Sequence, residues 1–161
     1  MKIRKSYVYY GTGKGKTCLT IGRGLRALGD NLQVVMIQFL EIRERQENEV
    51  LKNFEPHFRL FRFEKARQEE DLLNEDVKKE ITSEVKHAFK FANKIVDTGE
   101  CEMLILDGIL DCVASGYLTI EDLSDMLDKK PQYMDLILTG ESLPEGIADK
   151  VDSVYQIVDE K

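Results

Sequence analysis

The glycine-rich stretch 11–17, with the sequence GTGKGKT, constrains the fold more than any other part of the chain. It follows the strand-like run SYVYY at 6–10 and precedes a helical pattern. In this position glycines let backbone N–H groups converge on an anion, and the helix N-terminus adds a partial positive charge. The usual phosphate loop reads G-x-x-x-x-G-K-[ST]. Gly15, Lys16 and Thr17 supply its ending, but Tyr10 stands where the first glycine belongs, and Gly11 lies one residue too close.

Two interpretations of this stretch are open, a shortened phosphate loop and a flexible turn whose lysines face solvent. A phosphate loop would use Lys16 to bridge the outer phosphates and the Thr17 hydroxyl to ligate Mg²⁺. A second acid at the end of a later buried strand usually completes such a metal site, and Asp107 stands there. Taken alone, Asp107 fits the N-cap of a helix equally well. Strand, loop, helix and distant acid together favour nucleotide binding.

Strand-like and helical segments alternate along the rest of the chain. The predicted strands are 6–10, 32–39, 58–63, 102–107, 134–140 and 153–158. The predicted helices are 17–28, 73–99, 119–130 and 143–151, with Thr119 and Asp122 forming a capping box. Alternating βα segments predict an α/β fold of P-loop NTPase (RecA-like) architecture, with a mostly parallel sheet of five to six strands and helices on both faces. Residues 1–161 are expected to form a single nucleotide-binding domain.

Two segments allow a more specific prediction. Segment 58–63 alternates apolar residues with arginine, which indicates an exposed or edge strand. The charged segment 41–56 is read as a solvated helix, with a lid over a site as the alternative.

Composition and charge narrow the classes of partner. The 161 residues carry 23 basic and 30 acidic side chains, for a net charge of −7. This charge argues against general binding of nucleic acid or of anionic membranes. The sequence contains neither a long apolar run nor a signal-peptide pattern, and its three cysteines form no C-x-x-C pair. We therefore expect a cytoplasmic location. Its two histidines, His57 and His87, are read as surface or packing residues.

The shortened motif G-x-G-K-G-K-T resembles the P-loop corrinoid adenosyltransferases, which adenosylate cobalamin and its precursors. Segment 22–40 is similar to that family's helix, Ala-Leu-Gly turn and Val-Val-x-x-Gln-Phe strand. Segment 104–127 resembles its Leu-Asp-Glu stretch followed by Gly-Tyr-Leu and a helix, and 136–140 followed by Pro144 resembles its next strand. The likeness covers nearly the whole chain, so the chain is identified as a divergent member of the family.

The resemblance implies an activity and the residues that serve it. In that family a Co(I) corrinoid attacks the 5′ carbon of ATP, which is bound in a reversed orientation, and triphosphate leaves intact. It implies catalytic roles for Lys14 and Lys16, and for Phe63 as an aromatic near the lower face of cobalt. Magnesium, ATP as co-substrate and a corrinoid substrate follow, as do a homodimer and a possible flavoprotein reductant. The predicted nucleotide-binding residues are Gly11, Thr12, Gly13, Lys14, Gly15, Lys16, Thr17 and Cys18, and the predicted metal ligands are Thr17 and Asp107.

Three positions depart from the family pattern. Gly108 replaces the glutamate after the strand-end aspartate, Glu141 replaces an arginine, and Glu41-Ile42 replaces a Lys-Gly pair. Two hypotheses follow: an active transferase of reduced activity, or a paralogue that binds ATP or corrinoid without transfer. A P-loop kinase or ATPase is a third reading. If these departures limit the rate, the double change Gly108→Glu with Glu141→Arg is expected to raise turnover more than ATP affinity.

Overall fold

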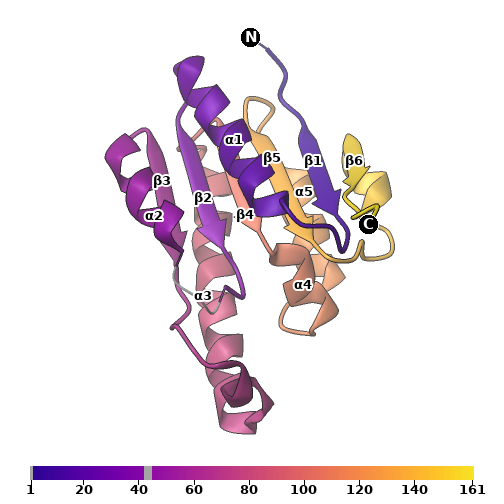
Figure 1. The fold of residues 1–161 in the computed structure, drawn as a ribbon. Helices are drawn as coiled ribbons and strands as arrows, with labels where there is room; N and C mark the ends of the chain where they lie inside the picture. The colour runs from indigo at the N-terminus through magenta and orange to yellow at the C-terminus, as the bar shows by residue number, and fades with distance from the viewer. Residues whose placement is uncertain (1, 42–44) are drawn as a thin grey trace.

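A six-stranded parallel sheet forms the centre of the protein (Figure 1). The computed structural model describes residues 2–41 and 45–161. The strand order is β3-β2-β4-β5-β1-β6, and every neighbouring pair is parallel. The strands are β1 (Ser6–Tyr10), β2 (Val34–Gln38), β3 (Phe58–Arg62), β4 (Met103–Asp107), β5 (Asp135–Gly140) and β6 (Ser153–Gln156). The predicted α/β class with a parallel sheet is confirmed, and β3 is the edge strand that its sequence indicated.

Helices cover both faces of this sheet. The α-helices are α1 (Lys16–Gly29), α2 (Gln46–Leu51), α3 (Glu75–Thr98), α4 (Ile109–Ala114) and α5 (Ile120–Lys129). The short 3₁₀ helices are η1 (Lys52–Phe54), η2 (Glu69–Leu73) and η3 (Ala148–Lys150). Helix α1 lies on one face, and α3 and α5 lie on the other (Figure 1). In the part of the chain that the structure describes, no helix is both long and apolar enough to cross a bilayer.

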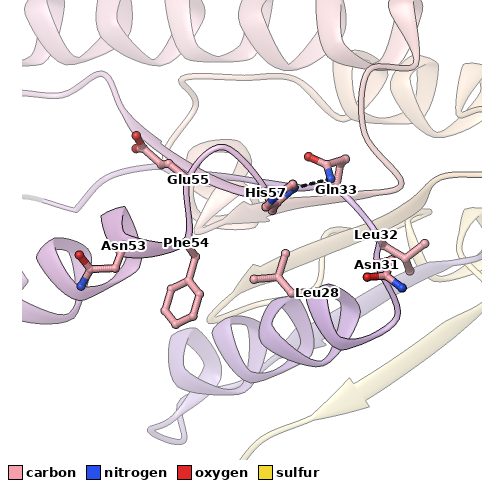
Figure 2. A pocket seen from close by; sticks show the side chains of 8 residues that line it. All are labelled: Leu28, Asn31, Leu32, Gln33, Asn53, Phe54, Glu55 and His57. Carbon is pink, nitrogen blue, oxygen red and sulfur yellow. Dashed lines mark hydrogen bonds between the residues drawn. The ribbon is translucent and has the colours of Figure 1, made fainter.

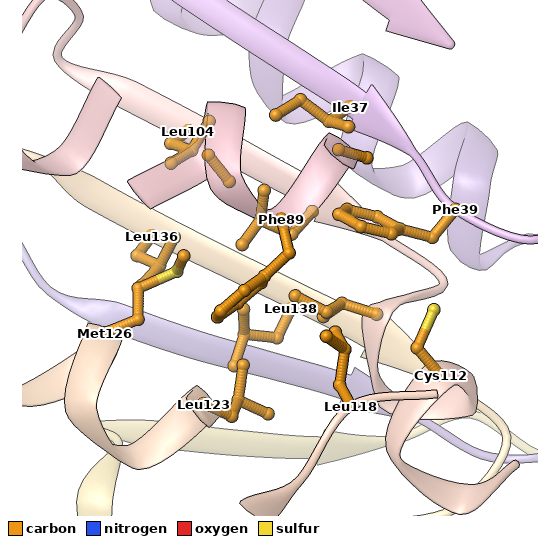
Figure 3. Close-up of a cluster of buried hydrophobic side chains, with 14 of the residues drawn as sticks. Ile37, Phe39, Phe89, Leu104, Cys112, Leu118, Leu123, Met126, Leu136 and Leu138 are labelled. Atoms are coloured by element: carbon orange, nitrogen blue, oxygen red, sulfur yellow. The ribbon is translucent and has the colours of Figure 1, made fainter. Parts of the chain in front are cut away.

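Alternate side chains of the central strands enter two separate cores, because successive strand residues point to opposite faces. Val35, Ile37, Leu104 and Leu106 pack with α3, α4 and α5 in the larger core. Figure 3 shows Phe89 of α3 among side chains of β2, β4 and β5. The intervening strand residues pack against α1 in the smaller core. Burial on both faces explains why these strands show apolar runs in the sequence and no clear alternation.

Three expectations about helices need correction. The helix predicted at 143–151 is wrong: only η3 forms, because Pro144 fixes its own φ and Gly146 adopts a left-handed φ of 88°. Helix α3 begins after Asn74, whose side chain accepts a hydrogen bond from the Asp76 N–H, so Leu73 belongs to η2 and is exposed. Helix α4 was not predicted. The capping box at the start of α5 is confirmed.

Candidate functional site

The glycine loop between β1 and α1 is enclosed by the C-terminal segment of the chain. Gly13 N–H donates to the Ile157 carbonyl at 2.9 Å, and Ile157 N–H donates to the Tyr10 carbonyl at 2.7 Å. A Cβ atom on Gly11 would lie 2.1 Å from the Ile157 oxygen, and one on Gly13 would lie 2.8 Å from the same residue. Gly11 also has a φ of 132°, which disfavours other residues. Two of the three glycines are therefore required by the close approach of residue 157.

Lys16 holds its ammonium group inside this loop. Its Nζ donates to the carbonyls of Gly11 at 2.6 Å and Gly13 at 2.8 Å. The N-cap of α1, Gly15, makes no side-chain capping bond, so no side chain competes for the helix N-terminus. One cation and a helix N-terminus thus converge on the loop, as anion binding requires. By contrast, the Lys14 side chain is exposed.

Asp107, at the end of β4, connects this strand to β5 and to the first turn of α1 at the carboxyl edge of the sheet. Its Oδ2 accepts a hydrogen bond from the Thr17 hydroxyl at 2.8 Å, and its Oδ1 accepts one from the Thr139 hydroxyl at 2.7 Å. Thr139 Oγ1 in turn accepts the Gly108 N–H at 2.8 Å. Burial raises the pKa of the Asp107 carboxyl, against the hydrogen bonds from Thr139 and Thr17, which lower it. The N-cap of α4 is Gly108, so Asp107 is not the helix cap considered above.

The hydroxyl of Thr17 and the carboxylate of Asp107 are oxygen donors that fit Mg²⁺. This ion is usually bound by one or two protein oxygens, several waters and substrate phosphates. Within residues 2–41 and 45–161, no group of three or more His, Cys, Asp or Glu side chains could hold a metal on its own. The pair therefore fits a cation that shares its coordination with a phosphate.

Two further acids, Asp111 and Glu141, lie beside the loop, and sequence reasoning assigned a role to Glu141 alone. Asp111 accepts a hydrogen bond from the Glu141 N–H at 2.8 Å. Burial raises the pKa of the Asp111 carboxyl, against the hydrogen bond from the Glu141 N–H and the charge of Lys16, which lower it; the charge of Glu141 raises it. Asp111 stands four residues after Asp107, on the next short helix. Because Asp107 ends a strand and Asp111 lies in a helix, this spacing puts them on no common helix face, and no local sequence pattern identifies Asp111.

Gly108 has a backbone that only glycine adopts easily. Its φ is 85°, and a Cβ atom there would lie 2.6 Å from the Phe39 carbonyl oxygen. A side chain at this position would strain the backbone and displace the chain after β2. The expectation that Gly108→Glu would simply restore a family carboxylate is therefore not supported by this geometry.

Phe63 lies apart from the phosphate loop. It follows β3, and the strand order puts β2, β4 and β5 between β3 and β1. Four strand spacings amount to roughly 19 Å along the sheet edge. The rings of Phe61 and Phe63 lie 4.7 Å and 5.4 Å from that of Phe91 in α3. Phe63 and Phe91 also line a surface hollow of about 540 Å³ on α3. The structure thus groups Thr17 and Asp107 with the loop, and places Phe63 at the opposite end of the edge.

The charged segment after β2 forms a helix in part. Helix α2 packs against the sheet: the side-chain amide of its Asn48 hydrogen-bonds to that of Gln38 in β2, and the side chain of its Leu51 is buried. This agrees with the helical reading of 41–56, although Ile42 lies outside the described residues. The charge of Arg45, at the N-cap of α2, lowers the pKa of Asp107, so α2 begins near the site.

A hollow of about 310 Å³ lies at the amino edge of the sheet, remote from the loop (Figure 2). It is formed by the end of α1, the start of β3 and the 3₁₀ helix between them. His57 lies here, and its Nδ1 is 2.9 Å from Gln33 Nε2. His57 is therefore a surface packing residue, as its sequence context indicated.

The sequence of the chain matches one family of known proteins. Residues 4–161 match the family model for ATP:corrinoid adenosyltransferase BtuR/CobO/CobP. The corrinoid adenosyltransferase of Escherichia coli K12 is 27% identical over 150 residues, which cover 93% of this chain and 74% of that protein. Corrinoid adenosyltransferase CobA of Salmonella typhimurium LT2 is 27% identical over 157 residues, with the same coverage. A solved DNA replication initiation factor has 13% identity and a TM-score of 0.45, and the match covers 96% of this chain and 40% of that one.

Proposed function

The chain belongs to the ATP:corrinoid adenosyltransferase family, and from this premise we propose that it transfers the adenosyl group of MgATP to a reduced corrinoid. In this reaction the electron pair of the substrate's Co(I) attacks the 5′ carbon of ATP. A cobalt–carbon bond forms, the bond from the 5′ carbon to the triphosphate oxygen breaks, and triphosphate leaves with the bonding electrons. Residues 1–161 act as one nucleotide-binding domain in this proposal.

Negative charge grows on the leaving triphosphate, so its stabilisation is the main task of the protein. Lys16 and the N-terminus of α1 supply positive charge from the floor of the loop. Lys14, whose side chain is exposed, would approach from the solvent side. Thr17 and Asp107 would hold Mg²⁺, which neutralises phosphate charge when bound. The observation that carries the proposal is the hydrogen bond between Thr17 and Asp107, which brings together the two donors for that ion.

The corrinoid would lie toward β3. With triphosphate in the loop, the adenosine group can extend along the carboxyl edge toward β2 and β3. Phe63 and Phe91 offer an aromatic surface there, which suits the largely apolar face of a corrin ring. The roughly 19 Å between loop and Phe63 supports an extended nucleotide whose 5′ carbon lies between the two ends.

A paralogue that binds ATP without transfer is the second candidate. It is favoured by the acids beside the loop: Asp111 and Glu141 add negative charge where phosphate would bind. The loop can still hold ATP beside such charge, but the charge disturbs the placement of the 5′ carbon, on which the rate depends steeply.

An adenosylation assay with chemically reduced corrinoid and MgATP separates these candidates. Formation of adenosylcorrinoid together with intact triphosphate is the expected result. MgATP binding without product would favour the paralogue, and release of ADP or phosphate would favour a kinase or ATPase. A cytoplasmic location, a homodimer and a flavoprotein reductant complete the proposal, to be tested by fractionation, sedimentation and reductant-coupled turnover.

Glu141→Arg tests whether acidity near the loop limits the rate. Glu141 is exposed and follows Gly140, whose carbonyl accepts the Gly11 N–H at 3.0 Å. We expect the variant to bind MgATP more tightly and to turn over faster. Glu145→Arg is the matched control, since it makes the same charge change at an exposed site four residues further along the chain. An equal effect of both variants would assign the change to net charge alone.

A further inference from the structure

Asp111 places a carboxylate at the end of β5, beside the glycine loop. Its Oδ1 accepts the Glu141 N–H at 2.8 Å, and the same oxygen lies 3.1 Å from the position that a Cβ atom on Gly140 would take. The carbonyl of Gly140 in turn accepts the Gly11 N–H at 3.0 Å. Because β5 lies between β1 and β4, its end is one strand spacing, roughly 5 Å, from both the start of the loop and the end of β4.

The second carboxylate oxygen of Asp111 is available for a further contact. Within residues 2–41 and 45–161, no donor bonds to Oδ2 of Asp111, and this atom is not one of the fully buried polar atoms that lack a partner. It therefore keeps contact with solvent. Burial has the largest effect on the pKa of this carboxyl and raises it, and the charges of Lys16 and Asp107 act on it as well. The open oxygen thus lies in the field of the loop cation and of the strand-end acid.

Position 108 cannot supply a carboxylate here without strain. Gly108 has a φ of 85°, and a Cβ atom there would lie 2.6 Å from the Phe39 carbonyl oxygen. The same glycine is the N-cap of α4, and the Asp111 N–H donates to its carbonyl at 3.1 Å. The first turn of α4 therefore brings Asp111 back over β5. The chain carries its acid three residues after the position where the family has glutamate.

A carboxylate at this place suits a cation that lies beside the phosphates. Mg²⁺ usually takes one or two protein oxygens and phosphate oxygens directly, and it keeps several waters. In the described ranges 2–41 and 45–161, no group of three or more His, Cys, Asp or Glu side chains could hold a metal, so Asp111 belongs to no ready-made metal cage. Its open oxygen can instead accept hydrogen bonds from the waters of an ion held by Thr17 and Asp107. Indirect contacts of this kind orient an ion and its ligands.

We propose that Asp111 is a positioning residue of the Mg²⁺ and nucleotide site, and that its Oδ2 atom accepts hydrogen bonds from the water shell of the ion. The inference rests on the MgATP site of the function proposed above. Asp111 provides the second carboxylate of this site, which position 108 lacks. The backbone N–H of Glu141 holds one oxygen and the ion's waters meet the other, so the ion is fixed relative to both β4 and β5. Asp111 therefore favours MgATP over metal-free ATP, whose phosphates its charge repels.

Binding of ATP to Asp111→Asn, measured by calorimetry with Mg²⁺ and with EDTA, tests this assignment. Asparagine keeps an oxygen acceptor for the Glu141 N–H and removes the charge. We expect the variant to bind MgATP about 10–100-fold more weakly, the usual loss for an indirect metal contact. Metal-free ATP should bind equally well or more tightly, because a negative charge near its phosphates is gone.

Glu141→Gln is the matched control. It removes one negative charge from the residue in contact with Asp111, and it keeps the backbone N–H that bonds to the carboxylate. The Glu141 side chain is exposed. Its neutralisation should leave the binding of both MgATP and metal-free ATP unchanged or make it tighter. The opposite signs for MgATP separate the placement of a carboxylate from the amount of charge near the loop.

The other outcomes overturn the inference. Tighter MgATP binding by Asp111→Asn would show that the carboxylate only repels phosphate, and an unchanged affinity would show that it does not act on the ion. An equal loss with Mg²⁺ and with EDTA would assign the change to the loop itself. Adenosyl transfer by the unmodified protein together with any of these results would leave the proposed function standing and reject the inference. Absence of MgATP binding by the unmodified protein would reject both.

A stability measurement guards against a purely structural role of Asp111. Without ligand, the midpoint of thermal unfolding should not fall in Asp111→Asn, because its side chain can still accept the Glu141 N–H. A lowered midpoint would show that the carboxylate serves to hold α4 against β5, and it would overturn the assignment. The rise of the midpoint on addition of MgATP should be smaller in the variant than in the unmodified protein, whereas the rise with ATP and EDTA should not be.

Discussion

Alanine substitutions at Gly108 and Gly116 measure how much stability the protein gains from having glycine at position 108, beside Asp107. Both have left-handed backbones, with φ of 85° and 81°. A Cβ atom on Gly108 would lie 2.6 Å from the Phe39 carbonyl oxygen, whereas one on Gly116 would have no atom within 4 Å. Alanine at position 116 therefore reports the backbone cost alone, and alanine at 108 reports that cost plus the contact.

The magnitudes follow from these two contributions. A left-handed backbone costs an L-residue about 1–2 kcal/mol, offset in part by about 0.4–1 kcal/mol of lost unfolded-state entropy. Gly116→Ala should thus destabilise by about 1 kcal/mol. In Gly108→Ala the chain near Phe39 must also shift to make room for the new Cβ atom, which costs about 1–3 kcal/mol, as overpacking usually does. Gly108→Ala should therefore lower the free energy of unfolding by about 2–4 kcal/mol in all.

Thermal unfolding followed by circular dichroism measures the difference. At about 2–4 °C per kcal/mol for a chain of this length, Gly116→Ala should lower the midpoint by about 2–4 °C and Gly108→Ala by about 4–16 °C. Equal midpoints for the two variants would refute the reasoning, because they would show that the chain near Phe39 yields without cost. In that case Gly108→Glu would again be a reasonable way to restore the family carboxylate.

Three further predictions concern the site and its surroundings. Lys16→Ala should weaken MgATP binding about 10–100-fold, the loss of one charge-assisted contact, and equal affinities by calorimetry would contradict the phosphate-loop assignment. Asp107→Asn should remove most of the dependence of ATP affinity on Mg²⁺, measured with and without EDTA; an unchanged dependence would place the ion elsewhere. The pKa of Glu64 in the fold is about 7, above the ordinary 4.5, so its contribution to stability is complete below pH 4.5 and is lost as pH rises through 7. Denaturant unfolding at pH 5 and pH 8 should show a loss on the order of 3 kcal/mol that Glu64→Gln abolishes.

Elements with a strong local pattern could be predicted from the sequence, and elements shaped by single residues could not. The six strands, α1, α3 and α5 follow from apolar runs, periodicity and caps. Helix α4 has six residues and starts at a left-handed glycine, so it carries neither a periodic window nor a usual cap. In 143–151, Ile147 and Val151 have helical spacing, but Pro144 and Gly146 decide the conformation.

For the candidate site, the loop and Asp107 were predictable because a strand-end position marks each of them. Thr139 and Asp111 lie near the loop because β5 is inserted between β1 and β4 in the sheet. No local sequence pattern predicts that strand order, so their position beside the loop could not be predicted.

The position of β1 has a consequence for the timing of biosynthesis. Among the described strands β1 pairs with β5 and β6, which follow the other four strands in the sequence, and residue 157 supports the loop after β1. At about 5–20 residues per second, the ribosome needs on the order of ten seconds after finishing β1 before its partners emerge. During that interval β2, β3 and β4 can already pair with one another, while the glycine loop remains without its native neighbours. The glycine loop therefore gains its native neighbours only once residue 157 has been made, and a chain interrupted before that residue would lack them.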